Sequence, residues 1–318
     1  MFPTGLSMLW ESTEPQSALK NRFGLGSFDE AAGWLTKVLA NAWAIEVHTC
    51  ERIIISGHNA IAWISTDRGA LVAKWSRDQD QFVKFAGTAD LLNVLHKEGL
   101  PVAPPLAATD GRHRVIIDSS SVAVQPHING ELLDTTADTA VRTAGACLAR
   151  LHGALAKQRD SRLTKLGRHT GGSLDLRQRL EAWLQHQDTG RAPAASARLR
   201  DRIASLPKID REPQLIHNDY RASNVLTSGT EIIAVLDFDE VALDYCVSDL
   251  ANASIYLGTR FTNWQPTPAS VREAFLHGYE SVRPLTRLER QWLHALTLWQ
   301  GINAIPPGDD PAGWARAV

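Results

Sequence analysis

The segment from His217 to Asn224 holds the residues best suited to chemistry. Its letters HNDYRASN place a histidine, an aspartate (Asp219) and an asparagine in the spacing H-x-D-x-x-x-x-N, and Asp237 follows thirteen positions after the asparagine. A carboxylate can accept the proton of an attacking hydroxyl, while Asn and Asp oxygens are ligands that suit Mg²⁺. These are the parts that phosphoryl transfer requires, so the sequence predicts that chemistry here.

Short strands must position these side chains. An apolar pair leads into the motif, a second apolar run begins at Asn224, and a turn at residues 227–230 precedes a strand at 232–236 that ends at Asp237. This pattern predicts a β-hairpin. A loop that leaves one strand and returns in the next can present Asp219 to a hydroxyl while Asn224 and Asp237 turn toward one cation.

Two interpretations of Arg221 stay open. It lies two positions after Asp219, so that its guanidinium could reach the transferring phosphoryl group and offset the negative charge that develops there. It could equally form a salt bridge at the surface of the loop.

The rest of the chain predicts two lobes. The first part is rich in strand patterns and contains a capped helix at about 28–42. Later, apolar residues three and four positions apart indicate helices, apart from the hairpin and a looser stretch at 167–197. We therefore predict an α+β fold with a small antiparallel β lobe (residues 1–126) and a larger, mostly helical lobe (residues 127–318).

Composition and charge exclude several classes of function. The chain has 318 residues and a formal net charge of -2, without the basic stripe that marks a nucleic-acid-binding protein. Its three cysteines lie far apart, which predicts reduced thiols rather than a disulfide framework or a metal cluster. Neither a signal-like segment nor an apolar run of membrane-spanning length is found. We expect a cytoplasmic protein that binds neither nucleic acid nor membrane.

Three segments carry a resemblance to a known family. LIHNDYRASNVL at residues 215–226, VLDFDE at 235–240 and DLA at 249–251 are similar to the catalytic loop, the metal-binding segment and the following helix start of the aminoglycoside phosphotransferase and choline kinase family. The resemblance implies a bilobal protein-kinase-like fold and the use of ATP and Mg²⁺. It also implies a role for each matching residue: Asp219 as catalytic base, Asn224 and Asp237 as Mg²⁺ ligands, His217 as a brace of the loop, and Asp249 as its anchor.

The resemblance extends less specifically to the first lobe. Ser56-Gly57-His58-Asn59 resembles the turn that covers the phosphates, and Lys74, in the segment VAKW, is similar to the lysine that contacts the α- and β-phosphates. Residues 122–130 resemble the interlobe hinge, which implies that backbone groups around Gln125 and His127 meet the adenine edge. These residues make up the nucleotide site that the resemblance implies.

Some positions depart from the family pattern. The phosphate-covering turn has Gly57 alone where relatives are richer in glycine, and Thr88 stands near the place of a glutamate that pairs with the lysine, with Asp90 as the nearest acid. Asn218 replaces the usual glycine after the motif histidine, which Asn tolerates because it accepts unusual backbone angles. His152, in the family's recurrent Leu-His pair, is predicted to be a packed core residue.

The sequence leaves the acceptor open. We predict an enzyme that transfers phosphate from ATP to a hydroxyl of a small molecule, either an aminoglycoside-like antibiotic or an amino alcohol such as homoserine or choline. A catalytically silent nucleotide-binding module is the alternative, while a protein kinase is disfavoured because no long activation segment fits between Asp237 and Asp249. Oligomeric state and the choice between ATP and GTP do not follow from the sequence. The candidate acceptor contacts, each with an alternative as a solvated charge or a core residue, are Asp239, Glu240, Asp244, Trp264, Trp292 and Trp299.

Overall fold

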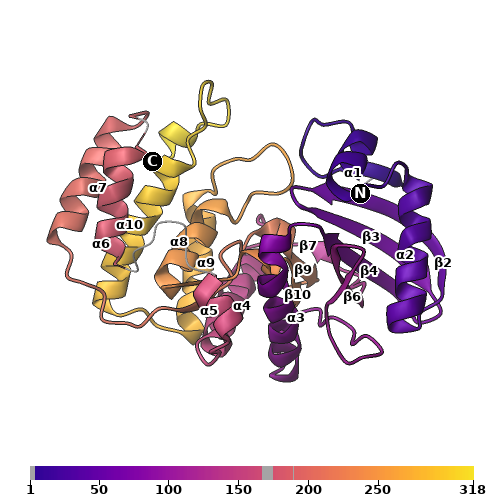
Figure 1. Ribbon diagram of the computed structural model, residues 1–318. Helices are drawn as coiled ribbons and strands as arrows, with labels where there is room; N and C mark the ends of the chain where they lie inside the picture. Colours follow the sequence, from indigo (N-terminus) through magenta and orange to yellow (C-terminus); the bar gives the residue numbers. More distant parts are fainter. Residues whose placement is uncertain (1–3, 167–174, 189) are drawn as a thin grey trace. The chain divides into compact units, whose positions relative to one another are not determined.

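The computed structural model describes residues 4–166, 175–188 and 190–318. The chain forms two compact units, residues 1–129 and 130–318 (Figure 1), so that the observed boundary falls three residues after the one drawn from the sequence. The first unit is rich in strands and the second is mostly helical, as the α+β prediction requires.

A six-stranded sheet forms the centre of the first unit. Its strands are β1 (Gly5–Met8), β2 (Val47–Ser56), β3 (Asn59–Thr66), β4 (Gly69–Ser76), β5 (Val115–Ile117) and β6 (Ser120–Pro126). They lie in the order β1-β2-β3-β4-β6-β5, and all neighbours are antiparallel except β1 and β2. The predicted antiparallel meander is therefore confirmed as β2, β3 and β4.

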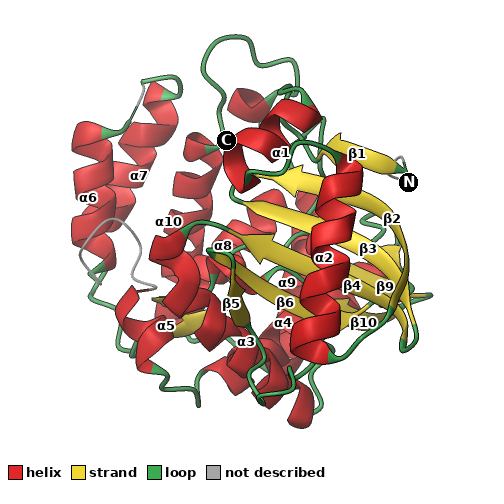
Figure 2. Cartoon of the chain, turned by 45° about the vertical axis from the view of Figure 1, so that its right-hand side comes forward, coloured by secondary structure: helices red, strands yellow, loops and turns green. Residues whose placement is uncertain are grey.

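Side-chain alternation explains how this sheet is buried. Along β3, every second residue is buried, as expected when one face of a strand meets a hydrophobic core. Helix α2 (Phe28–Trp43) lies across the sheet (Figure 2) and contributes its apolar stripe, with Leu35, Val38 and Leu39 buried. Ser27 caps this helix by accepting from the N–H of Glu30, so the helix predicted at 28–42 is confirmed. The unit also contains α1 (Pro15–Phe23) and α3 (Phe82–Lys97).

The second unit packs helices closely. They are α4 (Asp138–Leu155), α5 (Ser161–Leu166), α6 (Leu176–His186), α7 (Pro193–Ser205), α8 (Cys246–Tyr256), α9 (Ala269–Val282) and α10 (Arg287–Asn303). Glycines let α4 and α9 approach: a Cβ at Gly145 would lie 2.0 Å from the carbonyl oxygen of Phe275, and one at Gly278 would lie 1.9 Å from that of Arg142. This contact brings His152 of α4 next to Tyr279 of α9, which matters for the site below.

Short strands of the second unit carry the motif. β8 (Gln214–Ile216) pairs with β11 (Ala242–Asp244), while β9 (Val225–Ser228) pairs with β10 (Glu231–Val235) on one side and with β7 (Glu131–Leu132) on the other. All these pairs are antiparallel. The predicted hairpin after Asn224 is confirmed as β9 and β10.

Parts of the chain differ from the sequence expectations. The looser stretch predicted at 167–197 contains α6 and the start of α7, whereas its segment 167–174 lies outside the described residues. Strand β1 and helix α1 were not predicted from the sequence. Their segments are short or weakly patterned, so they give little local signal of secondary structure. Of the three free cysteines, Cys147 and Cys246 are buried and Cys50 is half-buried. Across the residues that the structure describes, no helix combines the length and apolar character of a membrane span.

Candidate active site

The catalytic loop, which we define as residues 217–224, joins β8 to β9. It leaves the sheet at Ile216, passes through a short 3₁₀ turn at Ala222–Asn224, and re-enters a strand at Val225. The hairpin closes on the loop, because the N–H of Leu236 donates to the carbonyl oxygen of Asn224 at 2.8 Å. Asn224 and the strand end at Asp237 therefore lie close together, as the motif spacing predicts.

Asp249, at the start of α8, ties the loop to the core. Its two carboxylate oxygens accept from the backbone N–H groups of His217 and Asn218, both at 2.9 Å. Asn218 has a positive φ of 67°, a conformation in which two successive N–H groups can face one acceptor. These two hydrogen bonds support the anchoring role that the resemblance implies for Asp249.

A buried histidine completes this anchor. The Nε2 atom of His152 lies 2.9 Å from Asp249 Oδ2, and its Nδ1 lies 2.8 Å from the hydroxyl of Tyr279. All three side chains are buried. Burial alone would raise the pKa of the Asp249 carboxyl, but the hydrogen bond and charge of His152 and the bonds from the loop hold it below its usual value. His152 is therefore a core residue, as predicted, and also a hydrogen-bonding partner of the loop's anchor.

His217 holds the loop from inside. Its ring accepts from the N–H of Asp219 at Nδ1 (3.2 Å) and contacts the carbonyl oxygen of Leu236 at Nε2 (3.0 Å). The ring packs against Phe238 with centroids 4.5 Å apart. Burial lowers the pKa of His217, which favours the neutral ring that this pair of contacts requires. These contacts fit a bracing role.

Asp219 lies at the centre of the loop with two polar partners. The amide nitrogen of Asn224 donates to its Oδ2 at 2.7 Å, and the guanidinium of Arg221 approaches its carboxylate at 3.1–3.2 Å. Burial raises the pKa of Asp219 to about 6; the positive charge of Arg221 opposes this rise, while the negative charge of Asp237 adds to it. The carboxylate is thus placed to accept a proton near neutral pH.

Arg221 has two neighbours within the second unit. Besides Asp219, its guanidinium lies over the ring of Trp264, 5.2 Å from the ring centroid. Of the two alternatives raised by the sequence, the salt bridge is present, and its partner is Asp219. A guanidinium in this place can also meet a phosphoryl group that approaches Asp219.

Asn224 and Asp237 offer the oxygens that a hard cation needs. The amide nitrogen of Asn224 donates to Asp219, which leaves its amide oxygen for another partner. Asp237 is exposed two residues after β10 and has a left-handed φ of 58°, and its charge raises the pKa of Asp219. One neutral and one charged oxygen ligand would fit Mg²⁺, which keeps waters and shares phosphate oxygens as further ligands.

The predicted nucleotide residues lie in the first unit. Lys74 is on β4, where it stands opposite Ile61 of β3 and Ala123 of β6. Ser56, Gly57, His58 and Asn59 form the turn between β2 and β3, which we call the phosphate-covering turn. Gly57 has a positive φ of 50°, which suits a glycine at a tight turn.

The hinge residues follow the same sheet. Gln125 of β6 stands opposite Val72 of β4, and the N–H of His127 donates to the carbonyl oxygen of Ala70 at 3.0 Å. The backbone N–H of His127 is therefore used within the sheet. Asp90, the acid nearest to the missing glutamate position, pairs with His113 at 2.9 Å.

The candidate acceptor contacts differ in their burial. Asp244 is buried and paired with Arg179 at 2.7 Å, so it belongs to the core rather than to an acceptor surface. Trp292 is also buried, with its indole N–H donating to the carbonyl oxygen of Pro207. Trp264, in contrast, is 44% exposed beside Arg221. Asp239 is half-buried and Glu240 is exposed.

Sequence reasoning missed two residues that hold the phosphate-covering turn. Glu11 accepts from the N–H of Gly57 at 3.1 Å, and Arg22 donates to the carbonyl oxygen of Gly57 at 2.8 Å. Glu11 and Arg22 also form an ion pair, and the hydrogen bond from Arg22 lowers the pKa of Glu11. No motif signals this arrangement, because its partners lie 35 and 46 positions apart.

Comparison with solved structures defines the fold class. A macrolide 2'-phosphotransferase of Brachybacterium faecium superposes with a TM-score of 0.64 at 19% identity, over 86% of this chain and 91% of that one. An amicoumacin kinase gives a TM-score of 0.59 at 15% identity, over 90% of each chain. At these identities the likeness concerns the fold alone, and it confirms the predicted bilobal protein-kinase-like fold.

Sequence comparison then gives the family. Residues 51–293 match the phosphotransferase enzyme family, and the chain belongs to it. Among curated relatives, homoserine kinase of Pseudomonas aeruginosa is 29% identical over 213 residues, which cover 64% of this chain and 62% of the relative. Homoserine kinase of Neisseria meningitidis is 28% identical over 216 residues, 64% of each chain. The match thus spans less than two thirds of the length of these relatives.

Proposed function

We propose that the protein transfers the γ-phosphoryl group of ATP to a hydroxyl of a small molecule. The observation that carries this proposal is the contact of Asp219 with both Asn224 and Arg221, inside a loop fixed by Asp249. Membership of the phosphotransferase family supports it. Phosphoryl transfer requires little covalent chemistry from the protein. Catalysis therefore depends on positioning the reactants and on stabilising the charge of the transition state.

The residues of the candidate site then have separate roles. Asp219 orients the acceptor hydroxyl and takes its proton, and Arg221 offsets charge on the phosphoryl oxygens. His217 keeps the loop backbone in place from the core. Asn224 and Asp237 would hold Mg²⁺, which when bound neutralises charge on the β- and γ-phosphates.

The first unit would bind the nucleotide. Lys74 supplies a positive charge for the α- and β-phosphates, and the turn formed by Ser56, Gly57, His58 and Asn59 covers them. Backbone groups near Gln125 and His127 would meet the adenine edge. In support, the amicoumacin kinase structure holds AMP-PNP and Ca²⁺, and a spectinomycin phosphotransferase of the same fold, with a TM-score of 0.56, holds ADP. Dependence on ATP would place the enzyme in the cytoplasm.

The acceptor is proposed as a class. Solved neighbours are named for macrolides and spectinomycin, which are antibiotics, and curated relatives for homoserine, an amino acid that carries both an amino group and an alcohol. Trp264 provides an exposed ring next to Arg221, on which an acceptor could stack. We propose an aminoglycoside-like antibiotic or an amino alcohol as the acceptor.

A narrower candidate is a kinase for homoserine or a similar metabolite. The 29% identity with homoserine kinase of Pseudomonas aeruginosa favours it, since the solved antibiotic kinases named above share at most 19% identity with this chain. It remains the second candidate, because identity at this level leaves room for a change of acceptor.

An acceptor screen tests both candidates. The purified protein would be given ATP and Mg²⁺ with a panel of aminoglycosides, macrolides, homoserine, choline and related alcohols, and ADP release would be followed. We expect acceptor-dependent ADP release, with mass spectrometry showing phosphate on the acceptor. Nucleotide binding without turnover for any acceptor would favour a catalytically silent module instead, and phosphate on protein would contradict the small-molecule assignment.

A further inference from the structure

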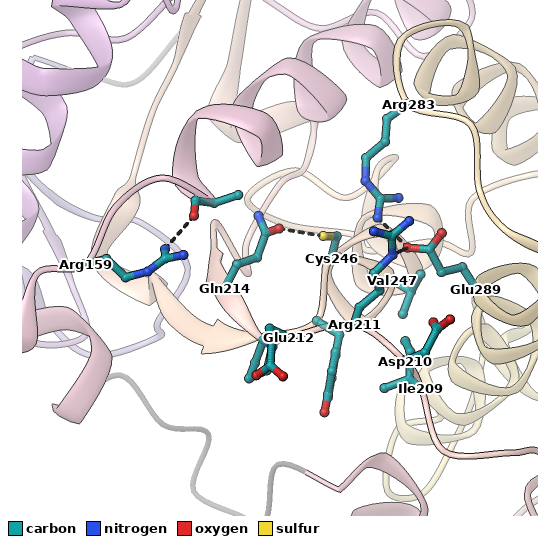
Figure 3. Close-up of a pocket in the computed structure, with 13 residues that line it drawn as sticks. Arg159, Ile209, Asp210, Arg211, Glu212, Gln214, Cys246, Val247, Arg283 and Glu289 are labelled. Carbon is teal, nitrogen blue, oxygen red and sulfur yellow. Dashed lines mark hydrogen bonds and ion pairs between the residues drawn. The ribbon is translucent and has the colours of Figure 1, made fainter.

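The second unit contains a cavity of about 470 Å³ that is separate from the candidate active site. It opens where residues 209–213 lead into β8, beside the first residues of α8 and the end of α9 (Figure 3). Gln214 lines it at one end of β8, whereas His217 follows the other end. Its size lies in the range of small-molecule pockets, and the proposed transfer reaction gives it no task.

The buried side of the cavity presents hydrogen-bond donors. Nη2 of Arg283 is bonded to Glu289, while its Nη1 atom is buried and has no hydrogen-bond partner among the described residues. Cys246 and Val247 are the first two residues of α8, so their backbone N–H groups have no acceptor within the helix. Donors and a helix N-terminus together favour an oxyanion.

The acceptors on this side are already engaged. Glu289 accepts from Arg283 and from the N–H of Thr286, with Arg211 3.9 Å away. Gln214 accepts from the thiol of Cys246 at 3.1 Å. Figure 3 shows Arg211 and Arg283 converging on Glu289, with the bonded Gln214 and Cys246 beside them. The side-chain acceptors Glu289 and Gln214 already accept hydrogen bonds, so a ligand oxygen can accept from the remaining donors.

The outer side carries charges of both signs. Asp210, Arg211 and Glu212 are consecutive, exposed residues of the lining, and Arg159 lines the cavity as well. With Arg283 and Glu289 included, three guanidinium groups and three carboxylates line the cavity. A multiply charged anion would meet these carboxylates, whereas a ligand with one positive and one negative group matches the whole lining.

We propose that this cavity binds a small zwitterion of the amino-acid type. Its carboxylate lies against Arg211, Arg283 and the N–H groups of Cys246 and Val247, and its ammonium group faces Asp210 or Glu212 at the rim. The proposal concerns binding alone, so it stands or falls independently of the phosphoryl transfer proposed above.

Two variants test the site from different directions. Arg211→Gln removes a rim charge from a side chain that is 57% exposed, so the fold should be retained. Ala156→Phe fills the cavity, since Ala156 lines it, without changing any charge. Arg200→Gln, on an exposed position of α7 outside the lining, is the matched control. Thermal unfolding would verify that all three proteins fold.

The probes separate the two charges of the ligand. Glycine and L-norvaline carry both groups, acetate only the carboxylate, ethylamine only the ammonium, and inorganic phosphate a stronger anion. Calorimetry on the full chain should show saturable binding of the amino acids, weakened about tenfold by Arg211→Gln, lost with Ala156→Phe and unchanged in Arg200→Gln. Hydrogen exchange of the Cys246 and Val247 amides should slow when the amino acid binds.

Other outcomes would overturn the proposal. Amino-acid binding that survives Ala156→Phe would place the ligand elsewhere, for instance at the acceptor site. Equal affinity for acetate and glycine would exclude the zwitterion class, as would tighter binding of phosphate. Absence of saturable binding by the wild-type chain would leave the cavity without this ligand.

Discussion

The catalytic loop and the phosphate-covering turn are each held by a carboxylate that lies far away in the sequence. Asp249 is fully buried, accepts from two loop N–H groups and pairs with His152. Glu11 has a side chain that is 23% exposed, accepts from one N–H group of the turn and pairs with Arg22. The loop anchor is therefore much more strongly desolvated than the turn anchor.

The difference in burial between the two anchors fits the different positional precision that their segments need. A proton acceptor must stay within a fraction of an ångström of its productive position, which a buried network secures. A turn that is proposed to cover phosphates would have to yield as a nucleotide enters and leaves, and a partly exposed ion pair permits this. Asp249 lies within the matched region 51–293, whereas Glu11 lies outside it.

The largest expected effect comes from removing the proposed proton acceptor, Asp219. Asp219→Ala should lower turnover by about two to four orders of magnitude, the usual share of a positioned general base. The free energy of unfolding should stay close to the wild-type value, because Asp219 does not tie the loop to the core. Acceptor-dependent ADP release and urea unfolding measure the two quantities. Asp201→Ala, at an exposed position of α7, is the control, and near-normal turnover in Asp219→Ala would refute the assignment.

Removing the loop anchor should affect stability and turnover together. Asp249→Ala leaves the N–H groups of His217 and Asn218 and the ring of His152 without their acceptor inside the core. Breaking a buried pair in this way costs about 3–5 kcal/mol of folding free energy. Urea unfolding followed by circular dichroism measures the loss. A loss of turnover with unchanged stability would instead give Asp249 a direct part in the chemistry.

Acid titration tests whether the negative charge of Asp249 stabilises the fold. The pKa of Asp249 in the folded protein lies below its usual value of 3.8, so its charged form stabilises the fold fully above that pH. This stabilisation is lost as the pH falls through the lowered pKa. The difference in unfolding free energy between wild type and Asp249→Asn should therefore shrink below about pH 4, which urea unfolding at several pH values measures. A difference that stays constant there would mean that Asp249 is not charged in the fold.

The sequence predicted the local elements of the site but not the long-range contacts that hold them. The spacing from His217 to Asp237 and the apolar runs around it predicted the hairpin, since strands and turns leave local patterns. The fate of Asp244 could not be predicted, because its partner Arg179 lies 65 positions away on a helix within a stretch interpreted as loose. Tyr279 reaches His152 across 127 positions, through a helix contact that depends on two glycines. Contacts of this kind depend on tertiary packing and leave no local signature.

The smallest expected effect concerns the turn. Glu11→Ala removes the acceptor for the N–H of Gly57 and the partner of Arg22, so the phosphate-covering turn should spend less time in its closed form. The loss of about one net hydrogen bond predicts a KM for ATP about fivefold higher, with kcat and thermal stability little changed. Glu51→Ala, at an exposed position of β2, is the matched control. Should Glu11→Ala lower kcat as strongly as Asp219→Ala and leave KM unchanged, the turn would need the same rigidity as the catalytic loop, and the contrast between the two anchors would disappear.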